Sequence, residues 1–88
     1  MNETELASLK LQLKQHVIQH LNLEGRTVAD IADDLPLFGD GLGLDSIDAL
    51  ELIVMMERHY GIRVTDPQQG REVFSTIDTM AAHIQQHT

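Results

Sequence analysis

The chain has 88 residues and no cysteine, and fourteen acidic against six basic residues give it a formal net charge of −8. We expect one small domain over residues 1–88 with little room for an enclosed active site. The charge argues against nucleic acid or an anionic membrane as a partner, and the lack of cysteine excludes disulfides and thiolate zinc sites. No apolar run approaches the ~18 residues of a membrane span and no signal segment opens the chain, so we expect a cytoplasmic, monomeric protein without membrane insertion.

The first helix is predicted over residues 2–21. Asn2 can cap its start, and Glu5 follows at the spacing of a capping box. Apolar residues then recur at steps of three or four and form one stripe, which consists of Leu6, Leu9, Leu13, Val17 and Leu21. We expect this stripe to pack against the rest of the domain.

A long connection is predicted over residues 22–44. This segment has no sustained period and contains Pro36 and four glycines. It also carries many apolar residues, which indicates that it packs across the helices instead of extending into solvent. One helical turn is expected near Thr27–Ile31.

The second helix is predicted from Ser46 to Tyr60, with Asp45 as N-cap and Gly61 as left-handed C-cap. At the helical repeat, one side collects the residues that we expect to face inward, namely Ala49, Leu50, Ile53, Met56 and Tyr60. The opposite side collects Asp48, Glu51, Met55 and Arg58. Met55, with Val54 at its border, is then an apolar group among charges and a candidate contact for a partner, although isolated exposed apolar residues are common.

The rest of the chain predicts an extended link over residues 62–64, a brief turn near Arg71–Phe74 and a last helix. Ser75 and Asp78 have capping-box spacing at the start of that helix. The residues of that helix expected to face inward are Ile77, Met80, Ala81 and Ile84. The fold class is therefore all-α, a small bundle of three main helices plus one short helix, with a long first loop.

The sequence contains little that indicates a catalytic site or a metal site. Ser46 lacks the Gly-x-Ser-x-Gly context of a nucleophile elbow, and every histidine is far from it in sequence. The glycines before Ser46 have neither the spacing of a phosphate-binding loop nor the oxygen ligands of a calcium loop. The pairs His16/His20 and His83/His87 have metal-binding spacing but no accompanying glutamate, so we expect no metal site and no enzyme activity.

Acidic residues gather around the start of the second helix. Between Arg26 and Arg58 there is no basic residue, whereas eight of the fourteen acids lie there. Such a run is often only a solvated face. Here it surrounds a helix N-terminus, where negative charge is favoured.

The segment LFGDGLGLDSIDALELIVMMERHYG resembles the phosphopantetheine-attachment segment of acyl carrier proteins. The Asp-Ser-Ile core is short, but the preceding Gly-Leu-Gly-Leu, the following Asp-Ala-Leu-Glu-Leu and the Tyr-Gly ending make the match specific. The resemblance extends to the length, acidity and helix order of all 88 residues.

The resemblance implies that Ser46, next to Asp45, carries a 4′-phosphopantetheine arm whose thiol holds acyl groups. A phosphodiester there would benefit from the free N–H groups of the helix start. The implied partners are a phosphopantetheinyl transferase and acyl-loading, condensing and transfer enzymes with basic docking patches. They would dock on the second helix through Asp45, Asp48, Glu51, Val54, Met55 and Glu57.

The resemblance also implies that acyl chains shelter between the helices. The residues expected to line that space are Leu9, Leu13, Leu50, Ile53, Met56, Ile77 and Met80, each of which could equally be plain core. Arg58 and His59 stand where fatty-acid carriers commonly have acids, and Gln68, Gln69 and Arg71 make the third-helix region less acidic than theirs. These departures favour a dedicated polyketide-like, polyene or lipid-modification pathway over housekeeping fatty-acid synthesis. An aminoacyl or peptidyl carrier, or an unmodified acidic adaptor in which Ser46 only caps the helix, remain the alternatives.

Overall fold

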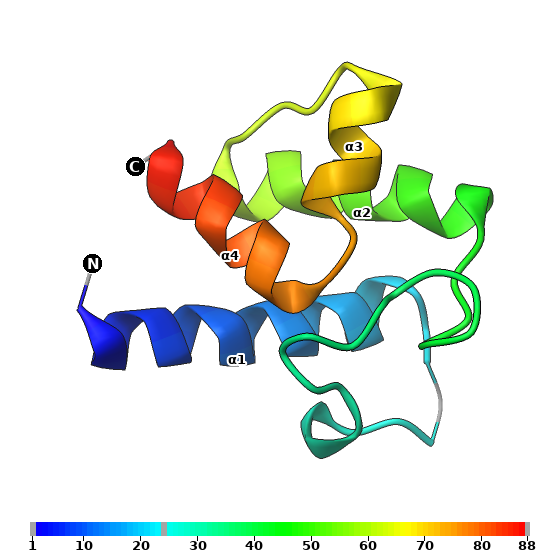
Figure 1. The fold of residues 1–88 in the computed structure, drawn as a ribbon, viewed down its shortest axis with the longest axis horizontal. Helices are drawn as coiled ribbons and strands as arrows, with labels where there is room; N and C mark the ends of the chain where they lie inside the picture. The colour runs from blue at the N-terminus through cyan, green and yellow to red at the C-terminus, as the bar shows by residue number, and fades with distance from the viewer. Residues whose placement is uncertain (1, 24, 88) are drawn as a thin grey trace.

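The computed structural model describes residues 2–23 and 25–87, and within these ranges the regular structure is helical, with no strand. Its elements in chain order are α1 (Glu3–His20), the short 3-10 helix η1 (Val28–Asp30), α2 (Ser46–Tyr60), α3 (Pro67–Val73) and α4 (Ile77–Gln86). The predicted all-α bundle is therefore confirmed (Figure 1). In the described ranges, no helix is long and apolar enough to cross a membrane.

The long helix α1 supports the bundle, packing against α2 and α4. Asn2 caps its start, because the Asn2 Oδ1 atom accepts the Glu5 N–H at 2.8 Å. Among the described residues the return bond from the Glu5 side chain is not formed, so only half of the predicted capping box is present. Its stripe packs inward, with Leu9, Leu13 and Val17 buried. Burial of three such side chains stabilises the bundle by roughly 1.5–3 kcal/mol each.

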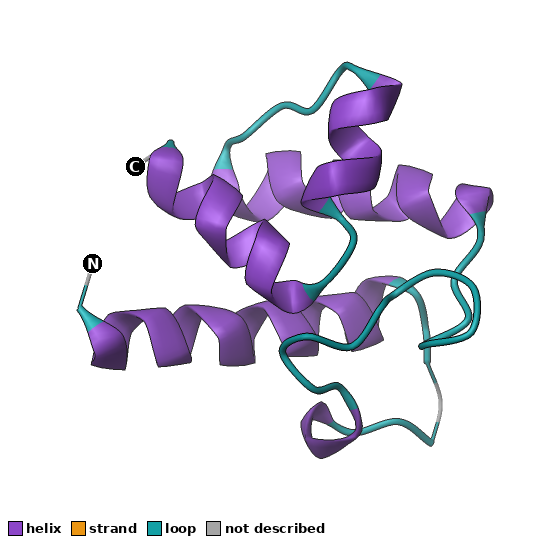
Figure 2. Cartoon of the chain, viewed as in Figure 1, coloured by secondary structure: helices purple, strands orange, loops and turns teal. Residues whose placement is uncertain are grey.

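Residues 21–45 connect α1 to α2 as one long segment that crosses the bundle, as Figure 2 shows. Ile31 and Leu37 are buried in the core, which confirms that this connection packs across the helices. Asp33 ties it to α1 through ion pairs with Lys10 (3.6 Å) and Lys14 (2.8 Å). Each partly exposed pair contributes only ~0.2–1 kcal/mol, so the buried apolar residues contribute most to holding the segment.

The glycine-rich end of this connection closes on Pro36. The Leu42 N–H donates to the Pro36 carbonyl at 2.9 Å, and a Cβ on Gly41 would collide with that same carbonyl group. Leu44 then donates its N–H to Leu37 at 3.0 Å. Gly41 is therefore needed for this internal turn, which delivers the chain to the start of α2.

The burial of α2 differs from the prediction. Leu52, Met55 and Met56 are the buried residues, whereas Leu50 is 62% exposed. Met55 was predicted as an exposed docking residue, and this is wrong because its side chain is completely buried. The inward face is rotated by roughly 100°, one residue's step, because α2 turns Leu52 and Met55 into the core and leaves Leu50 on the surface.

The region after α2 also differs from the prediction. Instead of a turn near Arg71–Phe74, the helix α3 begins at Pro67, where Asp66 caps it by accepting the Gln68 N–H at 3.0 Å. A proline at the first helical position has no N–H to leave unpaired, so the sequence supports a helix start there.

The start of α4 is displaced by one residue from the predicted cap. Thr76, and not Ser75, is the N-cap, and it forms a capping box with Thr79. The Ser75 hydroxyl instead donates to the Arg71 carbonyl at 2.6 Å, which closes the end of α3. The inward residues of α4 are as predicted, since Ile77, Met80, Ala81 and Ile84 are all buried.

Candidate functional site

Asp45 controls the start of α2. Its Oδ1 atom accepts the N–H groups of Ile47 and Asp48, both at 3.0 Å, and the Asp48 Oδ2 atom accepts the Asp45 N–H at 3.0 Å. Both halves of a capping box are therefore present, which confirms Asp45 as the N-cap. The structural role of Asp48 was missed, although an acid three residues after the cap is the signal for it.

This capping also changes the electrostatics of the site. Two of the backbone N–H groups that could stabilise an anion at the start of α2 already donate to the Asp45 carboxylate. An anion attached at Ser46 would therefore lie beside a negative charge, and the Ile47 and Asp48 N–H groups would not be free to stabilise it.

Ser46 occupies the first position of α2 and is exposed. Its hydroxyl makes no hydrogen bond to any residue that the structure describes, so no general base activates it. His59 lies thirteen residues further along the same helix, about 20 Å away at 1.5 Å per residue. The geometry fits a hydroxyl that another enzyme modifies and does not fit a catalytic nucleophile.

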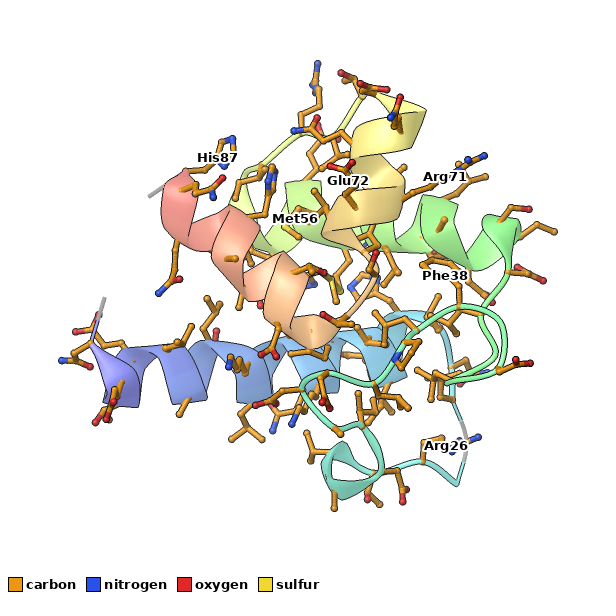
Figure 3. The ribbon with its side chains drawn as sticks, in the orientation of Figure 1. Arg26, Phe38, Met56, Arg71, Glu72 and His87 are labelled. Carbon is orange, nitrogen blue, oxygen red and sulfur yellow. The ribbon has the colours of Figure 1, made fainter. Side chains whose placement is uncertain are left out.

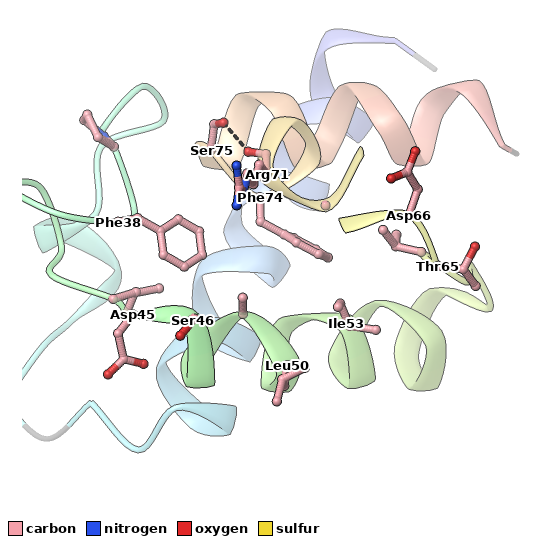
Figure 4. Close-up of a pocket in the computed structure, with 15 residues that line it drawn as sticks. Phe38, Asp45, Ser46, Leu50, Ile53, Thr65, Asp66, Arg71, Phe74 and Ser75 are labelled. Carbon is pink, nitrogen blue, oxygen red and sulfur yellow. Dashed lines mark hydrogen bonds between the residues drawn. The ribbon is translucent and has the colours of Figure 1, made fainter. Parts of the chain in front are cut away.

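An open pocket of about 890 Å³ lies beside Ser46, between α2, α3 and the long connection (Figure 4). Its walls are mostly apolar and include Phe38, Leu44, Ala49, Leu50, Ile53, Val64 and Phe74. Its polar groups are Asp45, Ser46, Thr65, Asp66, Arg71 and Ser75. The volume lies in the range of small-molecule sites, roughly 300–1,000 Å³.

This pocket is not the interior space that the sequence predicted. Leu50 and Ile53 do line it. The other residues expected there belong instead to the packed core, namely Leu9, Leu13, Met56, Ile77 and Met80. The space forms to one side of α2 because α3 lies across from that helix and carries glycine at Gly70, a pocket-lining position without a side chain.

The exposed face of α2 is more apolar than predicted. Ile47 (70% exposed), Leu50 and Val54 (43% exposed) follow one another at steps of three and four and form a stripe, here called the α2 stripe. Of the predicted docking residues, Val54 is in this stripe and the exposed Glu51 lies between its members. Ile47 and Leu50 were missed because Leu50 had been placed on the inward side.

The remaining predicted docking acids have partners of their own. Glu57 is exposed and pairs with Arg63 at 3.0 Å, which reduces its availability to a partner protein. Asp48 is partly buried and accepts the Asp45 N–H. Glu51 is exposed next to the α2 stripe and, among the described residues, forms no ion pair, so its charge is available to a partner protein.

The histidines of α1 and α2 form a cluster away from Ser46. The rings of His16 and His59 stack with centroids 4.0 Å apart, and the Nε2 atoms of His20 and His59 are 2.8 Å apart. Burial, followed by the neighbouring imidazoles, lowers the pKa values of His16 and His20 below their ordinary value. In the part of the chain that the structure describes, no three histidine or acidic side chains are placed to share a metal ion.

Comparison with known proteins assigns this chain to a family. Residues 12–84 match the family described as phosphopantetheine attachment site, which covers the pocket walls, α2 and Ser46. The chain belongs to the phosphopantetheine-binding acyl carrier proteins. Members of this family are carriers and not enzymes, and their cofactor is 4′-phosphopantetheine.

Individual relatives agree with this assignment. The carrier is 30% identical over 76 residues to an acyl carrier protein of Zymomonas mobilis, an alignment that covers 86% of this chain and 90% of the relative. It is 31% identical over 77 residues to an acyl carrier protein of Brachyspira hyodysenteriae, covering 86% of this chain and 91% of the relative.

The residues present fit the arm that the family carries. The Ser46 hydroxyl is exposed and makes no bond that would have to be broken before modification. The adjoining pocket is open and mostly apolar, so a chain that starts at Ser46 can enter it without crossing the core. When bound, the arm supplies the thiol that this cysteine-free carrier lacks.

Proposed function

We propose that Ser46 is the attachment site of 4′-phosphopantetheine, and that the chain holds acyl intermediates as thioesters on this arm. The observation that carries the proposal is an exposed, unbonded hydroxyl at the first position of α2, beside a pocket of about 890 Å³. In the attachment step the Ser46 oxygen attacks the phosphoanhydride of coenzyme A, which forms the phosphodiester and releases adenosine 3′,5′-bisphosphate. The serine proton passes to a base of the transferase, since no residue that the structure describes forms a hydrogen bond with the Ser46 hydroxyl.

The pocket is the seat for the acyl group in this proposal. Ile53 and Phe74 supply apolar walls on opposite sides, from α2 and from the end of α3. Removing a methylene group from water stabilises it by about 0.8 kcal/mol, so a chain of several methylenes would favour the pocket over solvent. The opening to solvent lets the acyl group leave when a partner enzyme binds.

The α2 stripe, together with Glu51, is the docking surface in this proposal. It presents Ile47, Leu50 and Val54 to a partner, next to a carboxylate and within a chain of net charge −8. Partners with a small apolar patch and surrounding basic residues would bind weakly, quickly and with strong dependence on salt. Such partners are the transferase and the enzymes that load, condense and transfer acyl groups.

We further propose that the carrier is a cytoplasmic monomer of a fatty-acid, polyketide-like or related lipid pathway. The exposed arginines Arg58 and Arg71 support a dedicated pathway over a housekeeping one. An aminoacyl or peptidyl cargo is the second candidate. Carriers of such cargo more often have Gly-Gly-[His/Asp]-Ser before the attachment site, and Leu44 stands here in place of the second glycine, which speaks against it.

Intact mass spectrometry tests the attachment site. The unmodified chain is incubated with coenzyme A and a broad-specificity phosphopantetheinyl transferase, beside Ser46→Ala and Ser75→Ala. The wild type and Ser75→Ala should each gain the mass of one phosphopantetheine, and Ser46→Ala should gain none. Ser75 is a matched control because it lines the same pocket but is engaged with the Arg71 carbonyl.

A stability measurement on Ser46→Ala also shows whether Ser46 acts as a helix cap or as an attachment site. Asp45 makes the capping bonds, so Ser46→Ala should change the free energy of unfolding by less than about 0.5 kcal/mol. Modification of Ser46→Ala, or failure of the wild type with several transferases, would remove the basis of the proposal and favour the unmodified adaptor.

A further inference from the structure

Arg71 lines the pocket without a counter-charge. It is exposed at the end of α3, and among the described side chains no carboxylate lies within ion-pair distance of its guanidinium group. Figure 3 shows the side chain extending outward from α3, and in Figure 4 its guanidinium group lies on the Phe38 side of the pocket. In a chain of net charge −8, an unpaired cation on the wall of an apolar pocket is an unusual feature.

The backbone of Arg71 is held in place. Its carbonyl accepts the Ser75 hydroxyl at 2.6 Å, and the N–H of Phe74 donates to the Gly70 carbonyl at 2.9 Å. The side chain therefore extends from a fixed point over the pocket. The two bonds leave the guanidinium donors themselves unused.

The acids that share this pocket are already engaged. Asp45 accepts the N–H groups of Ile47 and Asp48, and Asp66 accepts the N–H of Gln68. Each carboxylate is thereby directed at the start of its own helix and away from Arg71. The cation remains available to an anion that enters the pocket from outside the chain.

Two of the backbone donors at the start of α2 are not available to such an anion. A phosphodiester at Ser46 would carry one negative charge beside the Asp45 carboxylate, which already accepts the N–H groups of Ile47 and Asp48. Arg71 lines the same pocket as Ser46 and Asp45, and its planar guanidinium group matches phosphate oxygens. Arg71 thus supplies the positive charge that this helix start cannot.

We propose that Arg71 binds the phosphodiester of the arm attached at Ser46 and holds the near part of the arm at the mouth of the pocket. This inference rests on the proposed attachment at Ser46 and adds a positioning residue to it. Because Arg71 is solvent-exposed, the contact is weak and favours the docked arm over the free arm by roughly twofold to fivefold at low salt. A partner with a stronger basic patch can therefore take the phosphodiester over and release the arm.

The test uses the full chain in unmodified and phosphopantetheine-bearing forms, labelled with ¹⁵N. Wild type, Arg71→Gln and Arg58→Gln are compared, since Arg58 is an exposed arginine of α2 outside the pocket. Two kinds of NMR signal are followed, namely the Nε–Hε signals of Arg71 and Arg58 and the ³¹P signal of the arm. Intact mass is measured first, so that the state of Ser46 is known in every sample.

The expected result is a shift of the Arg71 Nε–Hε signal on attachment of the arm, while the Arg58 signal stays in place. Arg71→Gln should move the ³¹P signal and increase the mobility of the arm, Arg58→Gln should not, and salt near 1 M should reduce the difference. An Arg71 signal that is the same with and without the arm would overturn the inference while leaving the attachment at Ser46 intact.

A third sample set distinguishes the phosphodiester from a charged cargo. The arm is loaded with an alkyl acyl group and with the same chain ending in a carboxylate. If the Arg71 signal moved only with the carboxylate, Arg71 would recognise the cargo and the proposed role would be wrong. No mass increase on any sample would instead overturn the attachment itself, and this inference with it.

Discussion

Met55 and Leu50 lie on the same helix in opposite environments, so their truncation to alanine provides a direct test of how α2 is oriented. The Met55 side chain is completely buried, whereas that of Leu50 is 62% exposed. The sequence pattern alone predicted the reverse. Met55→Ala should therefore cost more stability than Leu50→Ala, whereas Leu50→Ala should weaken partner binding more than a substitution at Met55.

The expected magnitudes follow from burial. Truncation of a fully buried methionine removes its apolar contacts and leaves a cavity, at a cost of roughly 2–5 kcal/mol. Complete burial of a leucine stabilises by about 1.5–3 kcal/mol, so the buried minority of Leu50 contributes at most about 1 kcal/mol. A domain of this size has a total stability toward the low end of ~5–15 kcal/mol, so Met55→Ala should remove a large part of it.

Urea unfolding followed by circular dichroism measures both effects. With a slope of roughly 1–1.5 kcal/mol/M, Met55→Ala should lower the midpoint by roughly 1.3–5 M, and Leu50→Ala by at most about 1 M. Met55→Leu, which nearly conserves volume, is the matched control and should cost less than about 1.5 kcal/mol. In modification by the transferase, Leu50→Ala should be slower than wild type and Met55→Leu should not. A larger loss of stability for Leu50→Ala than for Met55→Ala would refute the orientation of α2 described here.

Two further predictions concern the loop and the histidines. Gly41→Ala should lower the free energy of unfolding by roughly 1–3 kcal/mol, because the added Cβ collides with the Pro36 carbonyl; Gly25→Ala, with nothing near its Cβ, should cost only the backbone strain of its positive φ, about 1 kcal/mol, as urea midpoints can show. Burial keeps the pKa values of His16 and His20 below the ordinary 6.5, so the unfolded chain takes up protons first on acidification. The stability that depends on neutral His16 and His20 should therefore be fully present above about pH 6.5 and be lost as the pH falls toward their lowered pKa values in the folded chain. Urea midpoints at about pH 7.5 and pH 5.5 measure this loss, and His16→Gln should make the two midpoints more alike.

Some of the fold could be predicted because its signals are local. Asp45 and Gly61 delimit α2 by capping chemistry, and both are confirmed, the first by two hydrogen bonds and the second by a φ of 66°. The stripe of α1 was also correct, since the other faces of that helix are mostly charged or polar, apart from the exposed Leu11, and only one face is strongly apolar. Caps and a single stripe depend on neighbours in sequence, so sequence is sufficient for them.

The orientation of α2 could not be predicted in the same way, because its apolar residues surround the helix. Leu50, Leu52 and Ile53 point in three directions within one turn, so a period of 3.6 selects no unique face. The choice depends on where α1 and α3 lie. For the same reason the pocket could not be found from sequence, since α3 has only seven residues and too little pattern to place it.

These three directions explain why α2 carries apolar residues on several faces. Leu52 and Met55 pack into the core, Ile53 lines the pocket, and Ile47 with Val54 is exposed on the α2 stripe. Leu50 lies at the border, since it belongs to the stripe and also lines the pocket. A helix that served the core alone would gain solubility by replacing its exposed leucine and isoleucine with polar residues. In the proposed function each face has a separate task, since the first holds the bundle together, the second receives the acyl group and the third meets the partner enzyme. Substitutions on the three faces should therefore separate into losses of stability, of cargo protection and of partner binding, which a helix with a single role would not produce.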